Sequence, residues 1–315
     1  MTMTSKIPPD AISDIVKHNN LKTNSRDGAI YFDNEKEKFK HGYYLRIDAE
    51  KDKCHLKLEC SLAKFYAYFI SGRQTNFEYF SIAQAREAVS LLADRTKIDI
   101  DALNVTYYEV GANLYMPHDA KAYIDEIISI GPFEAKKTLF INPRYKGERI
   151  KTTVFHRHIK KTYKLYDKVH EMRDRDRADI PKGVNILRVE TTQRRVEKVT
   201  VALLFTPKFL KKIIQQFERD WRTAQFEPVI EVPPGTHQRK VELIRQLLYS
   251  SREEVLNAAK EDLKIGKLTE RRYRSIREFI TREWDEFADK IKTTKSPLEL
   301  EFRDVFNETL KILWC

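Results

Sequence analysis

The 315-residue sequence predicts an α+β fold in which a mixed or antiparallel sheet carries helices on one face and a helical C-terminal region follows. Two observations predict this class. Apolar and polar residues alternate at about 28–62, 106–115 and 138–169, as they do in half-buried strands. Helical spacing of apolar residues separates these stretches and dominates after residue 206. Strands, helix, strand, helix and strands in this order are typical of such a sheet.

The N-terminal half carries clear local signals. Residues 41–47 and 55–60 alternate as strands do. A helix is predicted to begin at Ser81, because Gln84 completes a capping box with it. The buried stripe of this helix would consist of Ile82, Ala85, Val89 and Leu92. A strand over 106–115 and a helix over about 117–129 are expected next.

The strand predicted at 162–168 places a tyrosine between two cations. With a period of two, Lys164, Tyr166 and Lys168 share one face. The other face, which we expect to be the core, would hold Tyr163, Leu165 and Asp167.

Two further strands would add carboxylates to the face of Tyr166. At 107–114, Glu109 and Asn113 would lie opposite an apolar set of Tyr108, Val110, Ala112 and Leu114. At 187–190, Arg188 and Glu190 would point away from a core that contains Leu187 and Val189. The same pattern is also typical of an ordinary solvated face of an amphipathic sheet. The sequence leaves both interpretations open, a functional site and a solvated face.

The C-terminal part is predicted to be helical. Thr206 caps a helix whose first residue is Pro207, with a stripe of Phe209, Ile213, Phe217 and Trp221. The proline-rich stretch 226–235 predicts a linker between a domain at 1–225 and a helical domain at 236–315. Helices are expected at about 236–249, 252–264, 269–292 and 298–313.

Two of these C-terminal helices fit a helix-turn-helix, with Gly266 in the turn. The second would open with Arg271, Arg272 and Arg274, whose charges oppose the helix dipole there. Contacts with DNA phosphates or a groove would explain these arginines. A plain αα-hairpin, with the arginines paired to neighbouring glutamates, is the alternative.

The charge distribution favours a polyanionic partner. The chain has a net charge of +11, and residues 141–200 hold 17 lysines and arginines against 8 acidic residues. The three cysteines, Cys54, Cys60 and Cys315, have neither zinc spacing nor a disulfide framework, which indicates a reducing compartment. Residues 1–10 lack an apolar signal segment and no membrane-length apolar run occurs. We expect a cytoplasmic protein of a bacterial host.

Four short segments carry a resemblance to a known family. In chain order they are Ser61-Leu62-Ala63-Lys64-Phe65, Glu109-Val110-Gly111-Ala112-Asn113, Tyr166-Asp167-Lys168 and Arg188-Val189-Glu190. Together they resemble four strand motifs of the replication initiators of filamentous phages and rolling-circle plasmids, a group of HUH-like tyrosine nickases. The family pattern has tyrosine, phenylalanine and valine where this chain has Phe65, Val110 and Ala112. The resemblance covers roughly residues 40–215.

The resemblance implies a palm-like sheet with a tyrosine that nicks origin DNA, leaving a 5′-phosphotyrosyl link and a priming 3′-OH. A phenol with a pKa of ~10 needs nearby positive charge to act as a nucleophile. Lys164 and Lys168 would supply that charge to Tyr166, which makes Tyr166 the candidate nucleophile. Tyr163 is the alternative.

A divalent metal, Mg²⁺ or Mn²⁺, would polarise the scissile phosphate, and Glu109 and Glu190 offer the oxygen ligands that it prefers. HUH endonucleases carry two metal-binding histidines around a hydrophobic residue, which resembles His156 and His158 except that Arg157 lies between them. On one unbroken strand these histidines would lie about 27 to 33 Å from Tyr166, so they reach it only if the chain turns back. The alternative is a basic surface along the DNA path.

The expected partners are single-stranded DNA and duplex origin DNA, with host replication machinery, and oligomerisation is open. Lys160, Lys161 and Arg188 would bind DNA in the sheet domain, as would Arg271, Arg272 and Arg274 in the tail. A non-catalytic DNA-binding or replication-control protein of the same fold is the alternative function. A tyrosine recombinase is disfavoured, because no C-terminal helix carries a suitable tyrosine.

Overall fold

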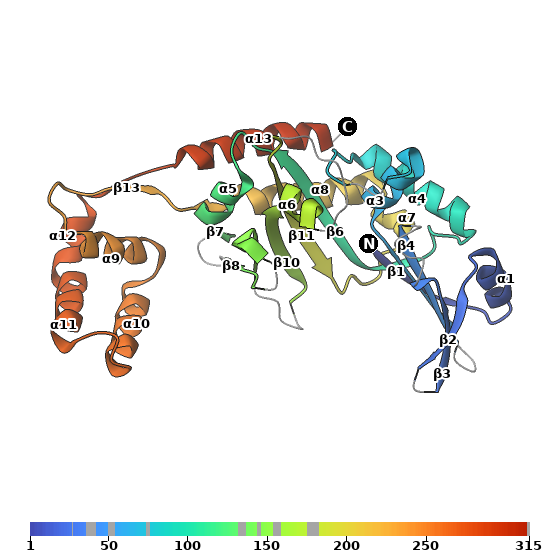
Figure 1. Cartoon of the computed structure of the whole chain (residues 1–315), viewed down its shortest axis with the longest axis horizontal. Coiled ribbons are helices and arrows are strands. Elements are labelled where there is room, and N and C mark those ends of the chain that lie inside the picture. The colour runs from blue at the N-terminus through green and yellow to red at the C-terminus, as the bar shows by residue number, and fades with distance from the viewer. Residues whose placement is uncertain are drawn as a thin grey trace. The chain divides into compact units, whose positions relative to one another are not determined.

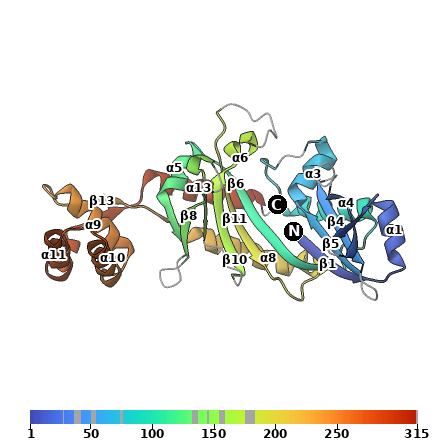
Figure 2. The ribbon, with the colours of Figure 1, turned by 60° about the horizontal axis from the view of Figure 1, so that its bottom comes forward.

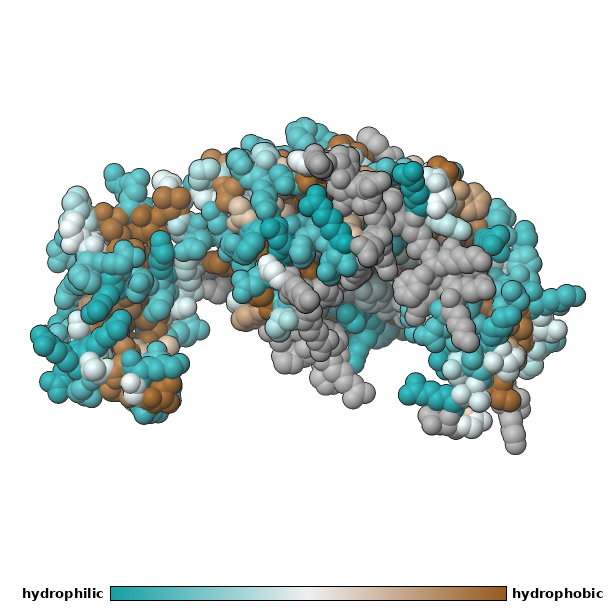
Figure 3. All heavy atoms as spheres, in the orientation of Figure 1, coloured by the Kyte–Doolittle hydropathy of each residue, from teal (hydrophilic) through white to brown (hydrophobic). Residues whose placement is uncertain are grey.

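The computed structural model describes residues 1–26, 28–35, 42–49, 54–73, 76–131, 137–143, 146–153, 159–174 and 183–313. It is a mixed α/β structure with a large antiparallel sheet (Figure 1). The chain forms two compact units: unit 1 comprises residues 1–226 and 297–315, and unit 2 comprises residues 227–296. Figure 3 shows hydrophilic side chains over most of the visible surface of each unit. Within the described part of the chain, no helix combines the length and apolarity needed to cross a bilayer.

The sheet of unit 1 has the strand order β12-β7-β8-β9-β10-β11-β6-β1-β5-β4-β3-β2. Its strands are β1 (Thr2–Ile7), β2 (Lys22–Arg26), β3 (Ala29–Asp33), β4 (Tyr43–Ala49), β5 (Cys54–Cys60), β6 (Asn104–Tyr115), β7 (Ile127–Ile130), β8 (Lys137–Ile141), β9 (Ile150–Thr153), β10 (Lys161–Asp167), β11 (Ile186–Arg194) and β12 (Gln225–Phe226). The helices are α1 (Ala11–His18), α3 (Leu62–Ser71), α4 (Ile82–Thr96), α5 (Ala120–Glu126), α6 (Lys168–Asp174), α7 (Val201–Leu204), α8 (Pro207–Arg222) and α13 (Pro297–Leu313), with a short 3₁₀ turn at Lys146–Glu148.

Two apolar clusters form the core of unit 1. In the first, Met3 of β1 and Leu58 of β5 pack with Leu92 of α4. In the second, Val189 of β11 packs with Trp221 of α8. The second cluster also includes residues of α5 and α13, so these three helices cover one face of β6, β11 and β10. The opposite face of these three strands carries their polar side chains.

Both predicted helix starts in unit 1 are confirmed. Ser81 and Gln84 form the reciprocal capping box of α4. Thr206 caps α8, with its side chain accepting a hydrogen bond from the Phe209 backbone at 3.4 Å. These local signals hold because the capping groups lie within three residues of the backbone amides that they satisfy.

Several expectations differ from the structure. The helix expected over about 117–129 is α5, which ends at Glu126, and residues 127–130 form strand β7. Residues 62–71 form helix α3, so the first family-like motif does not lie on a strand as expected. Strand β10 ends at Asp167, so Lys168 begins α6 and does not continue the strand face. The C-terminal helix α13 belongs to unit 1 and not to a domain at 236–315, because its Phe302 and Phe306 are buried in the second core cluster.

Strand β6 has an incomplete partner on one side. It pairs with β11 from Tyr107 to Tyr115, but with β1 only between Asn104 and Tyr107. Among the described residues, the β1 side of residues 108–115 therefore has no neighbouring strand. Figure 2 shows the N-terminus at this opening beside β6.

Unit 2 is a small helical body with its own core. It contains β13 (Val229–Glu231), α9 (Gln238–Tyr249), α10 (Arg252–Lys264), α11 (Glu270–Glu278), a π-helical segment (Phe279–Glu283), α12 (Trp284–Ala288) and β14 (Lys292–Thr294). Ile244, Val255, Phe279 and Trp284 are buried together. Helices α10 and α11 are joined by a turn in which Gly266 has a φ of 74°. The single helix predicted at 269–292 consists of α11, the π-helical segment and α12, and it ends at Ala288.

Candidate functional site

The polar face of β10, β11 and β6 brings the motif residues together. Lys164 pairs with Glu190, which pairs with Gly111 on β6. Tyr166 pairs with Arg188, which pairs with Asn113. Because side chains alternate along a strand, these residues and Glu109 project from one face. The shared face predicted for Glu109, Tyr166 and Glu190 is present.

Glu190 is the centre of a buried ion cluster. Its Oε1 accepts hydrogen bonds from the Tyr166 hydroxyl at 2.9 Å and from Arg188 Nε at 2.5 Å. Its Oε2 lies 2.5 Å from Lys164 Nζ. Burial alone would raise the pKa of the Glu190 carboxyl, but Arg188 and Lys164 outweigh it and lower the pKa to about 2. Glu190 is therefore a carboxylate neutralised by two cations.

Arg188 ties this cluster to the segment after α3. Its Nη1 donates to Asn113 Oδ1 at 2.8 Å. The Asn113 amide in turn donates to the backbone carbonyls of Asn76 and Phe77 at 2.9 and 2.8 Å. The Tyr115 hydroxyl donates to the Phe77 carbonyl as well, at 2.9 Å. Residues far apart in the chain thereby form one hydrogen-bonded network.

Gly111 is required by the tight packing around Glu190. A Cβ at this position would lie 2.9 Å from Glu190 Cγ, 3.1 Å from an Arg188 guanidinium nitrogen and 3.1 Å from the Val189 carbonyl oxygen. The carbonyl oxygen belongs to the paired strand and cannot move aside. The glycine of the second motif therefore has a steric role.

Tyr166, the predicted nucleophile, is a buried hydrogen-bond donor. Its side chain is 6% exposed. Burial, and then the charge of Glu190, raise the pKa of the phenol well above its ordinary value. Lys164 Nζ and Lys168 Nζ lie 5.1 and 5.8 Å from its ring centroid, but their charges are shared with carboxylates. The predicted preference for phenolate is therefore not met in this arrangement.

Lys168 reaches the cluster from the start of α6. Its side chain is 1% exposed and its Nζ lies 2.5 Å from Glu171 Oε2. Burial lowers the pKa of the Lys168 ammonium to about 8, although Glu171 favours the charged form. A group with this pKa exchanges protons near neutral pH.

Tyr163 and Lys161 lie on the opposite, helix-covered face. The Tyr163 ring packs edge-on against Trp221, with ring centroids 6.2 Å apart. Lys161 Nζ lies 2.8 Å from Asp220 on α8. Neither side chain reaches the face of Tyr166. Lys160 is well exposed and lies 3.9 Å from Glu197.

Sequence reasoning missed the role of Tyr107 beside Glu109. The Tyr107 hydroxyl donates to Glu109 Oε1 at 2.5 Å, and the Thr192 hydroxyl donates to the same oxygen at 3.2 Å. Glu109 is exposed, unlike Glu190. The signal was present, because residues two apart on a strand share a face.

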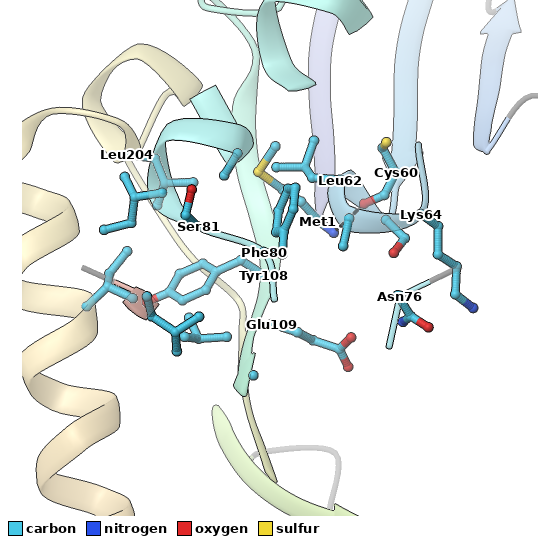
Figure 4. Close-up of a pocket in the computed structure, with 18 of the residues that line it drawn as sticks. Met1, Cys60, Leu62, Lys64, Asn76, Phe80, Ser81, Tyr108, Glu109 and Leu204 are labelled. Atoms are coloured by element: carbon cyan, nitrogen blue, oxygen red, sulfur yellow. Dashed lines mark hydrogen bonds between the residues drawn. The ribbon is translucent and has the colours of Figure 1, made fainter. Parts of the chain in front are cut away.

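A cleft of about 520 Å³ opens beside this face at the gap between β6 and β5. Glu109, Gly111, Asn113 and Arg188 line it from the sheet. Lys64 of α3 and Asn76 line it from the other side (Figure 4). Lys64 belongs to the first family-like motif, so residues of three motifs meet at this cleft.

Of the four predicted metal ligands, the described residues include Glu109 and Glu190. Among all the described residues, no group of three or more histidine, cysteine, aspartate or glutamate side chains is arranged to hold a metal ion. Glu190 does not fit as a ligand, because Arg188 and Lys164 already neutralise it. His156 and His158 lie outside the described residues.

In unit 2, Arg271, Arg272 and Arg274 are exposed on the first turns of α11. Arg274 lies 3.9 Å from Glu270, a distance at which an exposed pair contributes little. The Thr269 hydroxyl caps the helix by accepting from the Arg272 backbone at 3.3 Å. These arginines are accessible to a ligand of unit 2.

No family model and no curated protein matches this chain. Its function is therefore inferred from the geometry of the site and from the motif resemblance. The geometry gives a neutralised carboxylate, a tyrosine, three cations and an adjoining cleft on one sheet.

Proposed function

We propose that the protein is a rolling-circle replication initiator that nicks origin DNA through a tyrosine. One observation carries this proposal: motif residues dispersed between positions 109 and 190 lie on one face of three adjacent strands. This supports the proposal because a nicking site needs a tyrosine, cations and carboxylates close together on one face. The palm-like sheet that the family resemblance implies belongs to the same proposal.

Tyr166 is the proposed nucleophile. Its oxygen bonds to phosphorus as the phenolic proton passes to the Glu190 carboxylate that accepts its hydrogen bond. The bond from phosphorus to the 3′-oxygen breaks, and the 3′-oxygen takes up a proton. Lys168, whose pKa is lowered to about 8, is the proposed donor of that last proton. The product is a 5′-phosphotyrosyl link beside a free 3′-OH.

Attack by Tyr166 requires a change at Glu190. The phenol is held by Glu190 at 2.9 Å, and this bond favours the protonated form. A DNA phosphate that pairs with Arg188 or Lys164 would compete with Glu190 for these cations. The cluster would then open and release the hydroxyl toward the phosphorus. The buried state is the resting state in this proposal.

A divalent metal enters the proposal through the family resemblance alone. When bound, such an ion polarises the scissile phosphate. The described residues do not fit it, and the steps above use none. Adduct formation with and without Mn²⁺ tests the requirement.

Unit 2 is proposed to select the origin. The exposed Arg271, Arg272 and Arg274 on α11 support this role, because arginines at a recognition helix contact phosphates and base edges. A chain ending near residue 234 is not a clean test, since it also removes α13 from the core of unit 1. Substitution of the arginines is the better test.

A second function is favoured by the state of Tyr166. A buried phenol that donates to a carboxylate is typical of a structural residue. A non-catalytic DNA-binding or replication-control protein of the same fold would keep the cluster in this form. It would bind DNA and form no adduct.

The two functions separate in one experiment. The protein is incubated with labelled single-stranded DNA of random sequence and Mn²⁺, and then run on a denaturing gel. The nickase proposal expects a labelled band that survives denaturation and disappears after protease treatment. DNA binding in a native gel without any such band would support the second function and reject the first.

A further inference from the structure

We infer that the cleft beside β6 binds one nucleobase of a DNA strand, and that Glu109 selects bases carrying an exocyclic amino group. The inference deepens the proposed function, because it depends on DNA being the ligand of this sheet face. It does not depend on cleavage, since the non-catalytic function would use the same cleft.

The position of the cleft follows from the gap in the sheet. Beyond Tyr107, β6 has no β1 neighbour among the described residues, and this edge lines the cleft opposite residues of the segment 76–82. Arg188 belongs to the ion cluster, Gly111 packs against that cluster, and both residues line the cleft. A base in the cleft would therefore lie next to the face on which the phosphate is proposed to bind.

The size and walls of the cleft suit a planar aromatic group. Its volume of about 520 Å³ lies within the range of ligand sites, roughly 300 to 1,000 Å³. Tyr44, Tyr79, Phe80 and Tyr107 contribute rings to the lining. Unstacked bases of single strands bind proteins largely by stacking on such rings.

The polar groups of the cleft suit hydrogen-bond donors and not phosphate. Glu59, Glu78 and Glu109 line it, together with Lys64, Arg188 and the Met1 ammonium, which donates to the Cys60 carbonyl at 2.7 Å. Arg188 lies where the cleft meets the ion cluster, which is where the phosphate of the strand is proposed to bind. Carboxylates repel a phosphate group, so a free nucleoside triphosphate is a poor occupant. A neutral base attached to a strand is the better one.

Glu109 is placed to read the base edge. Tyr107 and Thr192 donate to its Oε1 and so fix the orientation of the carboxylate. Figure 4 shows this carboxylate directed into the cleft toward Asn76. A carboxylate accepts from the amino groups of cytosine, adenine and guanine, whereas thymine has none. We therefore expect discrimination against thymine.

The test measures binding of fluorescein-labelled dC12, dA12 and dT12 by anisotropy in EDTA, and a denaturing gel of the same samples checks that no covalent adduct contributes to the signal. Wild type should bind dC12 or dA12 at least about fivefold more tightly than dT12, as one base-edge contact gives. Glu109→Gln should reduce that ratio to below about twofold. Glu308→Gln, on the exposed end of α13, is the matched control and should keep the wild-type ratio.

A second variant tests the cleft by filling it. Ala63 lines the cleft at the start of α3, and Ala63→Trp should abolish the preference without lowering dT12 affinity more than about twofold. Equal affinities in wild type, or a full preference retained in Glu109→Gln, would overturn the inference. Free dCMP should not displace labelled dC12 when both are present at the same concentration of nucleotides. If it does, the cleft binds a free nucleotide, and the inference that its occupant is a base of a DNA strand is wrong.

These outcomes are distinct from failure of the nickase proposal. Covalent adducts without any base preference would reject the cleft assignment and leave the nickase standing. A base preference without adducts would support the cleft together with the non-catalytic function.

Discussion

Replacing Arg188 with methionine should strongly destabilise unit 1. The change removes the guanidinium that donates to Glu190 and Asn113 and leaves a carboxylate 4% exposed, with Lys164 as its remaining cation. Lowering the Glu190 pKa from 4.5 to about 2 corresponds to about 3 kcal/mol of stabilisation, which Arg188 and Lys164 provide together. Breaking a buried ion pair by removing one partner costs ~3 to 5 kcal/mol. We therefore expect a loss of about 3 kcal/mol.

The assay is urea unfolding followed by tryptophan fluorescence in a Trp284→Phe background. Of the remaining tryptophans, Trp221 is buried in the second core cluster, so its signal reports unit 1. The double variant Arg188→Met with Glu190→Gln should recover at least about half of the loss, because no charge is then left buried. A loss of unfolding free energy below about 1 kcal/mol would refute the ion-cluster account. So would an Arg188→Met loss that is equally large in the Glu190→Gln background.

Further predictions concern the same face and unit 2. Gly111→Ala should destabilise unit 1 by about 1 to 3 kcal/mol, measured by the same unfolding assay, because its Cβ meets the Val189 carbonyl oxygen at 3.1 Å. The folded-state pKa of Glu190 is depressed, so the stabilisation that it provides is complete above about pH 4.5 and is lost as pH falls toward 2. In Glu190→Gln, the free energy of unfolding should therefore change less with pH in that window. Arg272→Ala should weaken binding to origin duplex by ~1 to 3 kcal/mol and to random duplex much less, as titrations with both DNAs would show. Equal losses on both would indicate phosphate contacts alone.

The faces of β6, β10 and β11 could be predicted from sequence because alternation is a property of each strand. Leu187 and Val189 are fully buried and Arg188 and Glu190 point the other way, as the period of two requires. The capping box at Ser81 could be predicted for a similar reason, since all its atoms lie within one helical turn.

What could not be predicted depends on contacts between distant segments. Nothing local to Tyr166 shows that Glu190 accepts its hydroxyl and holds it buried. The return of α13 to unit 1 depends on an apolar stripe that would equally suit a separate helical domain. The cleft depends on where β1 stops pairing with β6, which is a matter of sheet register. The order of the motifs along the chain does not determine any of these three features.

The most direct test of the nicking proposal is to map the nucleotide-linked residue in the covalent adduct. The adduct formed with single-stranded DNA and Mn²⁺ is digested with nuclease and trypsin and analysed by mass spectrometry. Trypsin cuts after Lys161, Lys164 and Lys168, so Tyr163 and Tyr166 fall in separate peptides. The account predicts a nucleotide on the peptide of residues 165–168 and none in Tyr166→Phe. A nucleotide on the peptide of residues 162–164, or no modified tyrosine on this sheet, would contradict it.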